Sequence, residues 1–318
     1  ATLGYVASPS ASRLAGGRTG AVGVVVPWIT RWFFATVVES AERTLHAAGW
    51  DLLLYNLGGD PAGRRVFDTQ SLTKRVDAVV LVSVPLSTED SQALARLTMP
   101  GVTVSAGSPV PGWPRIRIDD VAAGRTATEH LLDLGHTRIA HLSGDSSDRL
   151  AHTTHRDRRA GYRSALAARG RDADPALDVE TQFTVDGGAR ATRELLRRAE
   201  PPTAIFAACD EMAMGAIRAL REARLRVPED VSVIGIDDHD LAAVLGLTTV
   251  GQPAAEQGRL AAATVLDSLF GIQPVEQDVL LPTGLVVRES TGPPHEARRW
   301  PPKPGDGQHD RIASERAG

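Results

Sequence analysis

Two histidines give this sequence its nearest approach to a metal site. His152 and His155 are spaced H-x-x-H, with Asp148 and Asp157 as the nearest carboxylates. A protein zinc site needs three or four ligands, each oriented by further hydrogen bonds. Two histidines and loosely spaced aspartates do not supply that set. We therefore expect this segment to be a loop that lines a pocket, and we expect no metal.

The sequence motifs of nucleotide binding and of common hydrolases are missing. Gly58 and Gly59 are not followed by G-x-G-x-x-G spacing, and neither Lys74 nor Lys303 stands in a phosphate-binding loop. G-x-S-x-G and H-E-x-x-H are also absent. The single cysteine, Cys209, has no activating histidine or lysine near it in sequence, which favours a small residue at a strand end. We expect neither an enzyme nor a cofactor.

The elements that must position any site follow a regular rhythm. From Ala21 onward, short apolar runs alternate with amphipathic segments, which predicts an α/β fold with parallel sheets covered by helices. The predicted strands are 21–26, 51–55, 78–82, 102–104, 115–118, 139–142, 204–207, 231–236 and 248–250. Three helices are also legible: 34–48 stopped by Gly49, one with Asp210 as its N-cap, and about 254–270.

Length, composition and charge limit the number of lobes, the cellular compartment and the partners that we expect. A chain of 318 residues with 42% hydrophobic content predicts two lobes of roughly 120 to 150 residues. One cysteine allows no internal disulfide, and no apolar run approaches the roughly 20 residues that span a bilayer. Residues 1–20 do not read as a secretory signal, so we expect a cytoplasmic protein without membrane contact. The net charge of −4 is the wrong sign for neutralising many phosphates.

An ordered series of motifs covers about residues 3–294. It contains GVVVP and ITRWFF within 23–34, WDLLLYN at 50–56, RVDAVV at 75–80, EHLLDLGH at 129–136, RDRRAGY at 156–162, PTAIFAA at 202–208, DEMAMG at 210–215, LTTVGQP at 247–253 and LVVRES at 285–290. The densest member is VPEDVSVIGIDD at 227–238. The series resembles the lactose-repressor/galactose-repressor family of bacterial transcription regulators.

The resemblance implies two flavodoxin-like lobes of the type I periplasmic-binding-protein kind, joined by three crossovers near Asp119, Pro253 and Pro282. Residues 21–120 with 253–281 would form the N-terminal lobe. Residues 121–252 with 282–292 would form the C-terminal lobe. Residues 293–318 are rich in proline, glycine and charge, which predicts a disordered tail.

A small-molecule effector would bind in the cleft between these lobes, where open parallel sheets also place ligands on general grounds. The resemblance assigns contacts to Phe33, Phe34, Ser105, His152, Thr154, Arg158, Phe183, Cys209, Asp237 and Gln252. The aromatic rings would stack on a sugar face or a base, Arg158 would donate paired hydrogen bonds, and Asp237 would accept them from hydroxyls. The plainer alternatives are core filling for the phenylalanines and a solvated helix position for Arg158. Together these residue types favour a carbohydrate over a nucleobase.

This sequence departs from the family pattern at the predicted pocket. Cys209 stands where family members often carry Asn, and Ser105 where they often carry Asp. Trp28, Arg31 and Trp32 replace smaller or different residues. These changes weaken the transfer of sugar specificity and indicate an effector that is bulkier, more apolar or anionic.

Residues 1–20 resemble the end of a DNA-binding headpiece, its hinge helix and a linker. Within that hinge, Ser8 and Ser12 precede Leu14, which stands where the family pushes a leucine into the minor groove of operator DNA, an insertion that kinks the duplex. The alternative is a flexible leader, and without DNA we expect disorder. The helix-turn-helix of the family is not in this sequence, so operator contact is expected through that headpiece and the hinge. The family also implies a homodimer.

Two other classes of protein compete with a ligand-responsive regulator. A periplasmic solute-binding protein would need a secretory signal upstream. An α/β enzyme would need a base and a nucleophile in mutual reach, and no spacing in the sequence suggests such a pair.

Overall fold

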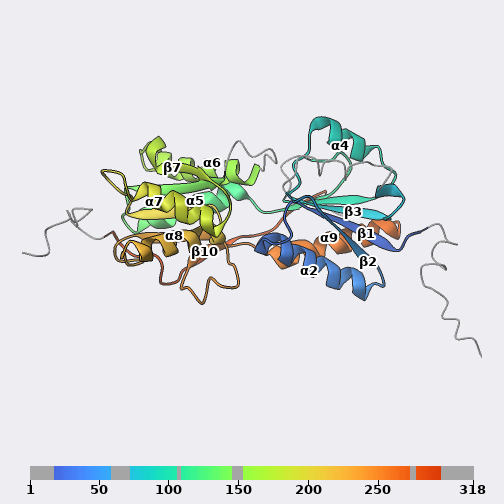
Figure 1. The fold of residues 1–318 in the computed structure, drawn as a ribbon. Coiled ribbons are helices and arrows are strands. Elements are labelled where there is room, and N and C mark those ends of the chain that lie inside the picture. Colours follow the sequence, from blue (N-terminus) through green and yellow to red (C-terminus); the bar gives the residue numbers. More distant parts are fainter. Residues whose placement is uncertain (1–17, 59–71, 106–108, 145–152, 273–276, 295–318) are drawn as a thin grey trace, which may run out of the picture.

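The computed structural model describes residues 18–58, 72–105, 109–144, 153–272 and 277–294. Its strands form two six-stranded sheets, each with its own helices. We call these the first lobe and the second lobe, and Figure 1 shows them side by side. The sequence predictions for Ser8, Ser12, Leu14 and His152 lie outside the described residues, as does nearly all of the predicted tail.

The first lobe is built on a parallel sheet in the order β11-β5-β4-β3-β1-β2. Its strands are β1 (Ala21–Val26), β2 (Asp51–Asn56), β3 (Ala78–Val82), β4 (Gly101–Val104), β5 (Arg115–Arg117) and β11 (Asp278–Leu280). Its helices are α2 (Trp32–Ala47), α4 (Thr88–Ala95) and α9 (Ala254–Leu269). Helices α2 and α9 cover one face and α4 the other (Figure 1). The central strands β1 and β3 are almost entirely buried, as all-apolar strands of a two-sided sheet should be.

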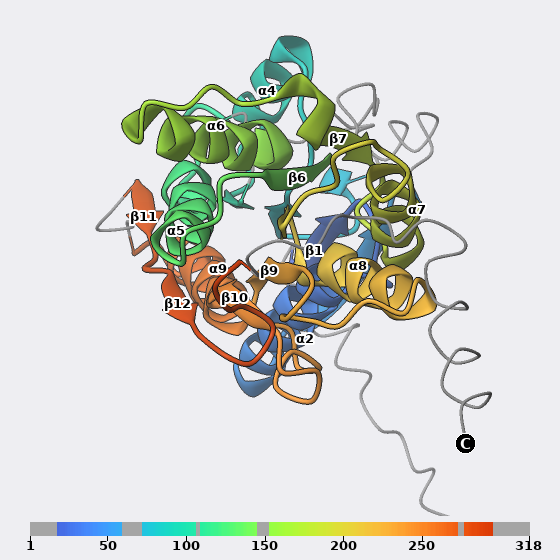
Figure 2. The ribbon, with the colours of Figure 1, turned by 90° about the vertical axis from the view of Figure 1, so that its left-hand side faces the viewer.

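The second lobe has the sheet order β12-β10-β9-β8-β6-β7, parallel except for the antiparallel edge strand β12. Its strands are β6 (Ile139–Gly144), β7 (Asp178–Thr181), β8 (Ala204–Ala207), β9 (Ser232–Asp237), β10 (Thr248–Gly251) and β12 (Gly284–Val286). Its helices are α5 (Asp120–Asp133), α6 (Thr153–Ala168), α7 (Val185–Leu195) and α8 (Asp210–Glu222), with a 3-10 turn at Pro175–Leu177. Figure 2 shows α5 and α6 on one side of the sheet and α7 and α8 on the other.

The chain passes between the lobes three times, after β5, after β10 and between β11 and β12. Helix α9 therefore packs on the first lobe although it follows the strands of the second. This is the predicted fold class, two parallel-dominated α/β lobes with three crossovers.

Two details differ from the sequence predictions. Three short strands, β7, β11 and β12, were not predicted, because their residues are largely exposed or mixed in polarity and carry no buried run. Asp210 is not the N-cap of α8. Cys209 holds that position without a side-chain cap bond, and Asp210 is the first helical residue. The buried Asp210 carboxylate instead accepts hydrogen bonds from Thr249 Oγ1 at 2.7 Å and from the His239 backbone N–H at 2.9 Å.

Candidate functional site

A cavity of about 490 Å³ lies between the two lobes, within the range of small-molecule sites. The first lobe contributes Trp28, Arg31, Trp32, Phe33, Phe34, Ser83 and Ser105 to its lining. The second lobe and the crossovers contribute Asp120, Thr154, His155, Arg158, Thr181, Gln182, Phe183, Cys209, Glu211, Asp237 and Gln252. Many of these residues end a parallel strand or follow one directly, which is where open α/β sheets bind ligands.

Three lining residues have backbones in sparsely populated conformations. Ser83 follows β3 with φ 46°, Ser105 follows β4 with φ 49°, and Asp237 ends β9 with φ 140°. Residues other than glycine adopt such conformations at a cost of roughly 1–3 kcal/mol, and they cluster at binding and active sites. The strain at three strand ends around one cavity marks it as a functional site.

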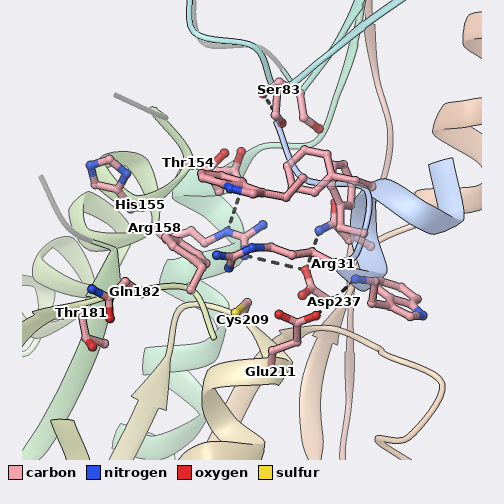
Figure 3. Close-up of a pocket in the computed structure, with 18 residues that line it drawn as sticks. Arg31, Ser83, Thr154, His155, Arg158, Thr181, Gln182, Cys209, Glu211 and Asp237 are labelled. Carbon is pink, nitrogen blue, oxygen red and sulfur yellow. Dashed lines mark hydrogen bonds and ion pairs between the residues drawn. The ribbon is translucent and has the colours of Figure 1, made fainter. Parts of the chain in front are cut away.

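Arg158 is the buried centre of the second-lobe side of the cavity. Its Nε donates to Asp120 Oδ1 at 2.8 Å, and its Nη1 donates to the Ala208 carbonyl oxygen. The same Nη1 lies 3.8 Å from Asp237 Oδ1 (Figure 3). Only 4% of Arg158 is exposed. One guanidinium therefore faces two carboxylates away from water, where unpaired charges are costly.

Close contact of two helices brings Arg158 to Asp120. A Cβ atom on Gly161 of α6 would lie 2.2 Å from the Val121 carbonyl oxygen of α5. A Cβ on Gly124 of α5 would lie 2.3 Å from the Arg158 carbonyl oxygen. Only glycine allows the two backbones to approach this closely. The glycines of the R-x-x-G segment and of α5 therefore set the position of the guanidinium.

The Asp237 carboxylate connects Arg158 to a hydrogen-bond chain that reaches the first lobe. Gln252 Nε2 donates to Asp237 Oδ1 at 2.6 Å, Gln257 Nε2 donates to Gln252 Oε1 at 3.1 Å, and Ser105 Oγ donates to Gln257 Oε1 at 2.8 Å. Burial raises the pKa of Asp237 to about 7, although Arg158 opposes the shift. Burial likewise raises the pKa of neighbouring Asp210 to about 6. We call Asp120, Arg158, Asp237 and Gln252 the second-lobe wall.

The opposite side of the cavity is mainly aromatic. Trp28 and Phe34 make an edge contact with ring centroids 6.3 Å apart, and Phe33 and Phe34 do the same at 5.4 Å. The guanidinium carbon of Arg31 lies 4.7 Å from the centroid of the Trp28 ring, a cation–π distance. We call Trp28, Arg31, Trp32, Phe33 and Phe34 the first-lobe wall.

Two contacts at Trp32 cross the cavity between the lobes. The backbone N–H of Trp32, at the start of α2, donates to Glu211 Oε1 of α8 at 3.2 Å. The Trp32 ring stacks on His239 with centroids 5.2 Å apart and planes inclined by 27°. A second-lobe carboxylate thus satisfies an N–H at the N-terminus of a first-lobe helix, whose own N-cap residue, Arg31, makes no side-chain cap bond.

Comparisons with known proteins agree with this geometry. A family model described as a periplasmic binding protein-like domain matches residues 128–291. The HTH-type transcriptional regulator DegA of Bacillus subtilis is 33% identical over 296 residues, which cover 92% of this chain and 86% of DegA. The chain belongs to the lactose-repressor/galactose-repressor family. That membership confirms the prediction of a transcription regulator and not an enzyme, and it does not favour the solute-binding alternative.

Solved structures of this repressor family share the fold. The complex of the regulator CelR with cellobiose has a TM-score of 0.75 and 34% identity, covering 86% of this chain and 85% of CelR. A LacI family regulator from Enterococcus faecium with bound ribose has a TM-score of 0.76 and 31% identity, covering 86% of this chain and all of that one.

Of the ten effector contacts that the family resemblance assigned, nine line the cavity. They are Phe33, Phe34, Ser105, Thr154, Arg158, Phe183, Cys209, Asp237 and Gln252, and the tenth, His152, lies outside the described residues. Burial raises the pKa of the Cys209 thiol well above its ordinary value, which fits an unreactive packing residue. In the described part of the chain, no three His, Cys, Asp or Glu side chains are grouped to hold a metal ion.

Sequence reasoning missed several residues that line the cavity of this repressor-family chain. Ser83 directly follows the predicted strand 78–82, so the tendency of ligands to bind at strand ends already pointed to it. Thr181 and Gln182 end and follow β7, which was not predicted. Asp120 gave no signal, because 38 residues separate it from its partner Arg158. Glu211 reaches the cavity only because the lobes meet. Among the described residues, none of the helices has the length and hydrophobicity that a bilayer crossing requires.

Proposed function

We propose that this repressor core binds a polyhydroxylated small molecule, most simply a carbohydrate, in the cavity between its lobes. The observation that carries the proposal is the second-lobe wall, where the charged and amide groups of Arg158, Asp237 and Gln252 line the same cavity as the aromatic rings. Sugars need this combination, because hydroxyls require both donors and acceptors and ring faces pack on aromatic side chains. The bound cellobiose and ribose of two related structures support the same ligand class.

A thermal-shift screen against sugars and nucleosides tests this proposal directly. A ligand at 100 times its dissociation constant should stabilise the fold by about 2.7 kcal/mol. Calorimetry then gives affinities, and Asp237→Asn should weaken sugar binding tenfold or more because a charged hydrogen-bonding group is lost in a partly dry site. The exposed Asp240 provides the control variant Asp240→Asn. Unchanged affinity in Asp237→Asn, or stabilisation by nucleosides alone, would refute a sugar site.

The effector acts, in this proposal, by changing the angle between two lobes that move as units, residues 21–120 with 253–281 and 121–252 with 282–292. A ligand that touches Phe33 and Phe34 on one side and Arg158, Phe183 and Asp237 on the other binds best at one lobe orientation, and it shifts the population toward that orientation. The hinge with Ser8, Ser12 and Leu14 precedes β1 directly, so first-lobe rotation alters hinge spacing on DNA.

Operator binding is the output to measure. In a protein that carries a helix-turn-helix headpiece before this hinge, operator affinity at fixed salt should change by at least fivefold when the effector identified by the screen is added, the lower end of ordinary allosteric coupling. A decrease would mark a repressor relieved by its effector. Equal affinity with and without the effector would leave a binding module without allosteric output. A regulator of this kind acts in the cytoplasm, where its operator is.

The chain also forms a homodimer in this proposal, through a face on which the starts of α2 and α8 meet the segment between β9 and β10. Helices α2 and α8 themselves carry no large exposed apolar side chain. Leu241 and Val244 of the adjoining segment are 50% and 80% exposed. Val244→Glu should therefore shift sedimentation at tens of micromolar from dimer to monomer, whereas Phe270→Glu, distant from this face, should not. A monomeric wild-type chain would refute the dimer.

A further inference from the structure

Arg31 carries a charge that nothing described in the cavity balances by hydrogen bonding. Its guanidinium is held over the Trp28 ring at 4.7 Å. Its Nη1 atom is buried and has no hydrogen-bond partner among the described residues. A buried donor without an acceptor costs roughly 1–3 kcal/mol, and more when it is charged. The site therefore favours a ligand that brings an acceptor to the Arg31 guanidinium, which lines the cavity.

The second arginine of the cavity, Arg158, has hydrogen-bond partners and nearby carboxylates of its own. Arg158 donates to Asp120 and to a backbone carbonyl, and Asp237 lies 3.8 Å away, so its charge is balanced before any ligand arrives. A neutral hydroxyl could accept a hydrogen bond from Arg31 but would leave its charge unmatched. A carboxylate or phosphate can take two parallel hydrogen bonds from a guanidinium and neutralise it.

We propose that the effector is an anionic carbohydrate, a sugar ring bearing a carboxylate or a phosphate, and that Arg31 binds its anionic group beside Trp28 in the first-lobe wall. The inference rests on the proposed function, since it assumes a sugar in this cavity. The ring and its hydroxyls then lie between the aromatic side chains and the Asp237–Gln252 pair. This assignment fixes the orientation of the ligand, with its anionic group toward the first lobe and its hydroxyls toward the second.

Three carboxylates line the same cavity and bear on this assignment. Asp120 and Asp237 both face Arg158, whose positive charge offsets theirs on the second-lobe side. Glu211 is different, because it reaches across the cavity to the N–H of Trp32. Its carboxylate should repel the anionic group that Arg31 attracts. Changes at Arg31 and at Glu211 should therefore move acid affinity in opposite directions.

The test compares each neutral sugar with its own acids. Calorimetry at pH 7.5 measures glucose, glucuronate and glucose 6-phosphate, then galactose and galacturonate, on the wild type, Arg31→Gln and the control Arg43→Gln. Arg43 lies on α2, the helix that follows Arg31, with 73% of its side chain exposed, so its variant makes the same change in net charge outside the cavity. At least one acid should bind the wild type about tenfold more tightly than its neutral parent. Arg31→Gln should lower the ratio of acid affinity to parent affinity about tenfold, and Arg43→Gln should leave that ratio unchanged.

Glu211→Gln supplies a second variant if Arg31→Gln does not fold. Glutamine retains an oxygen that accepts from Trp32 and removes the repulsion, so the ratio of acid affinity to neutral affinity should rise severalfold. The glucuronate and phosphate arms show which anionic group the site takes. Neutral sugars that bind as tightly as their acids, or an Arg31→Gln variant that loses both alike, overturn the anionic assignment and leave the sugar cavity standing. A wild-type chain that binds no sugar of the panel overturns both.

Discussion

The two walls of the cavity are built on different physical principles. In the second-lobe wall the charged groups are paired with one another, buried and fixed by hydrogen bonds, with Arg158 between Asp120 and Asp237. In the first-lobe wall the side chains are aromatic, and the one charged group, Arg31, rests on an indole ring. A preorganised polar wall loses little freedom when it orients hydroxyls. An aromatic wall with an unpaired donor can distinguish ligands that carry an anionic group from those that do not. In the proposed site, the second lobe thus orients the ligand and the first lobe selects among ligands.

Removing Arg158 should have the largest effect, because it breaks the pairing that defines the second-lobe wall. Arg158→Ala leaves Asp120 and Asp237 buried without their cation, and breaking a buried pair in this way costs about 3–5 kcal/mol. Urea unfolding at pH 7.5 measures the loss. The control is Arg163→Ala on the same helix, whose side chain is 57% exposed and pairs with Asp178, so its effect should stay within about 1 kcal/mol. Equal losses in the two variants would contradict the comparison.

The next effect comes from the glycine that lets α6 approach α5. Gly161→Ala places a Cβ 2.2 Å from a backbone oxygen, so the helices must separate and Arg158, one turn earlier, must move. Overpacking of this kind costs about 1–3 kcal/mol, and effector affinity should fall as well. Thermal unfolding and calorimetry measure both changes. Gly284→Ala is the matched control, because a Cβ there meets nothing within 4 Å. A Gly161→Ala protein as stable as this control would show that the close approach is not needed.

The two walls also differ in how far the sequence could predict them. The second-lobe residues Arg158, Asp237 and Gln252 stand in motifs, and the alternation of apolar runs and amphipathic helices predicted the strands next to Asp237 and Gln252. Their partner Asp120 could not be predicted, since the pairing depends on how α5 packs against α6. In the first-lobe wall, the family resemblance indicated a departure at Trp28, Arg31 and Trp32. Sequence could register that departure but not that Arg31 lies over Trp28.

Titration of Asp237 should have a smaller effect on the free energy of unfolding, and this effect belongs to the second-lobe wall. The pKa of this carboxyl is raised to about 7 in the folded chain, above its ordinary value of 3.8, mainly by burial. A raised folded pKa gives stability that is complete below the unfolded pKa and is lost as pH rises through the folded pKa. Wild-type stability should therefore carry a component that declines between about pH 4 and pH 7, in the same direction as the contribution from Asp210.

Asp237→Asn should remove that component and leave the part due to Asp210. Urea unfolding at half-unit steps from pH 4.5 to 8 measures the slope. This range avoids Asp178, whose pKa is lowered to about 2 by its partners His141, Arg159 and Arg163, so that it acts with the opposite sign below pH 4. Asp240→Asn, an exposed change in the same segment, should keep the wild-type slope. An unchanged slope in Asp237→Asn would mean that this carboxyl is not the group that titrates.

The smallest expected effect on folding lies where the walls meet. Trp32 stacks on His239 and donates its backbone N–H to Glu211, so both contacts depend on how the lobes are oriented. Each lobe has its own core, and losing these contacts should cost the folding of either lobe little, about 1 kcal/mol or less for the ring pair. Since few contacts hold the lobes together at this point, losing them lets the lobes move apart. Trp32→Ala and Glu211→Ala should thus shift the effector-free chain toward open orientations, which increases its radius of gyration in small-angle scattering. Glu211→Ala should leave the unfolding midpoint nearly unchanged, whereas Trp32→Ala should also lower it, because the ring packs on the first-lobe core. An effector that bridges the walls must then close the lobes itself. Its affinity should therefore fall severalfold, mainly through slower association. The control Phe270→Ala, on the exposed end of α9, should change neither the radius of gyration nor the affinity.

If scattering from Trp32→Ala matched the wild type without effector, the contacts at Trp32 would be a consequence of closure. The orientation of the lobes would then have to come from the crossovers and the Ser105–Gln257–Gln252–Asp237 hydrogen-bond chain.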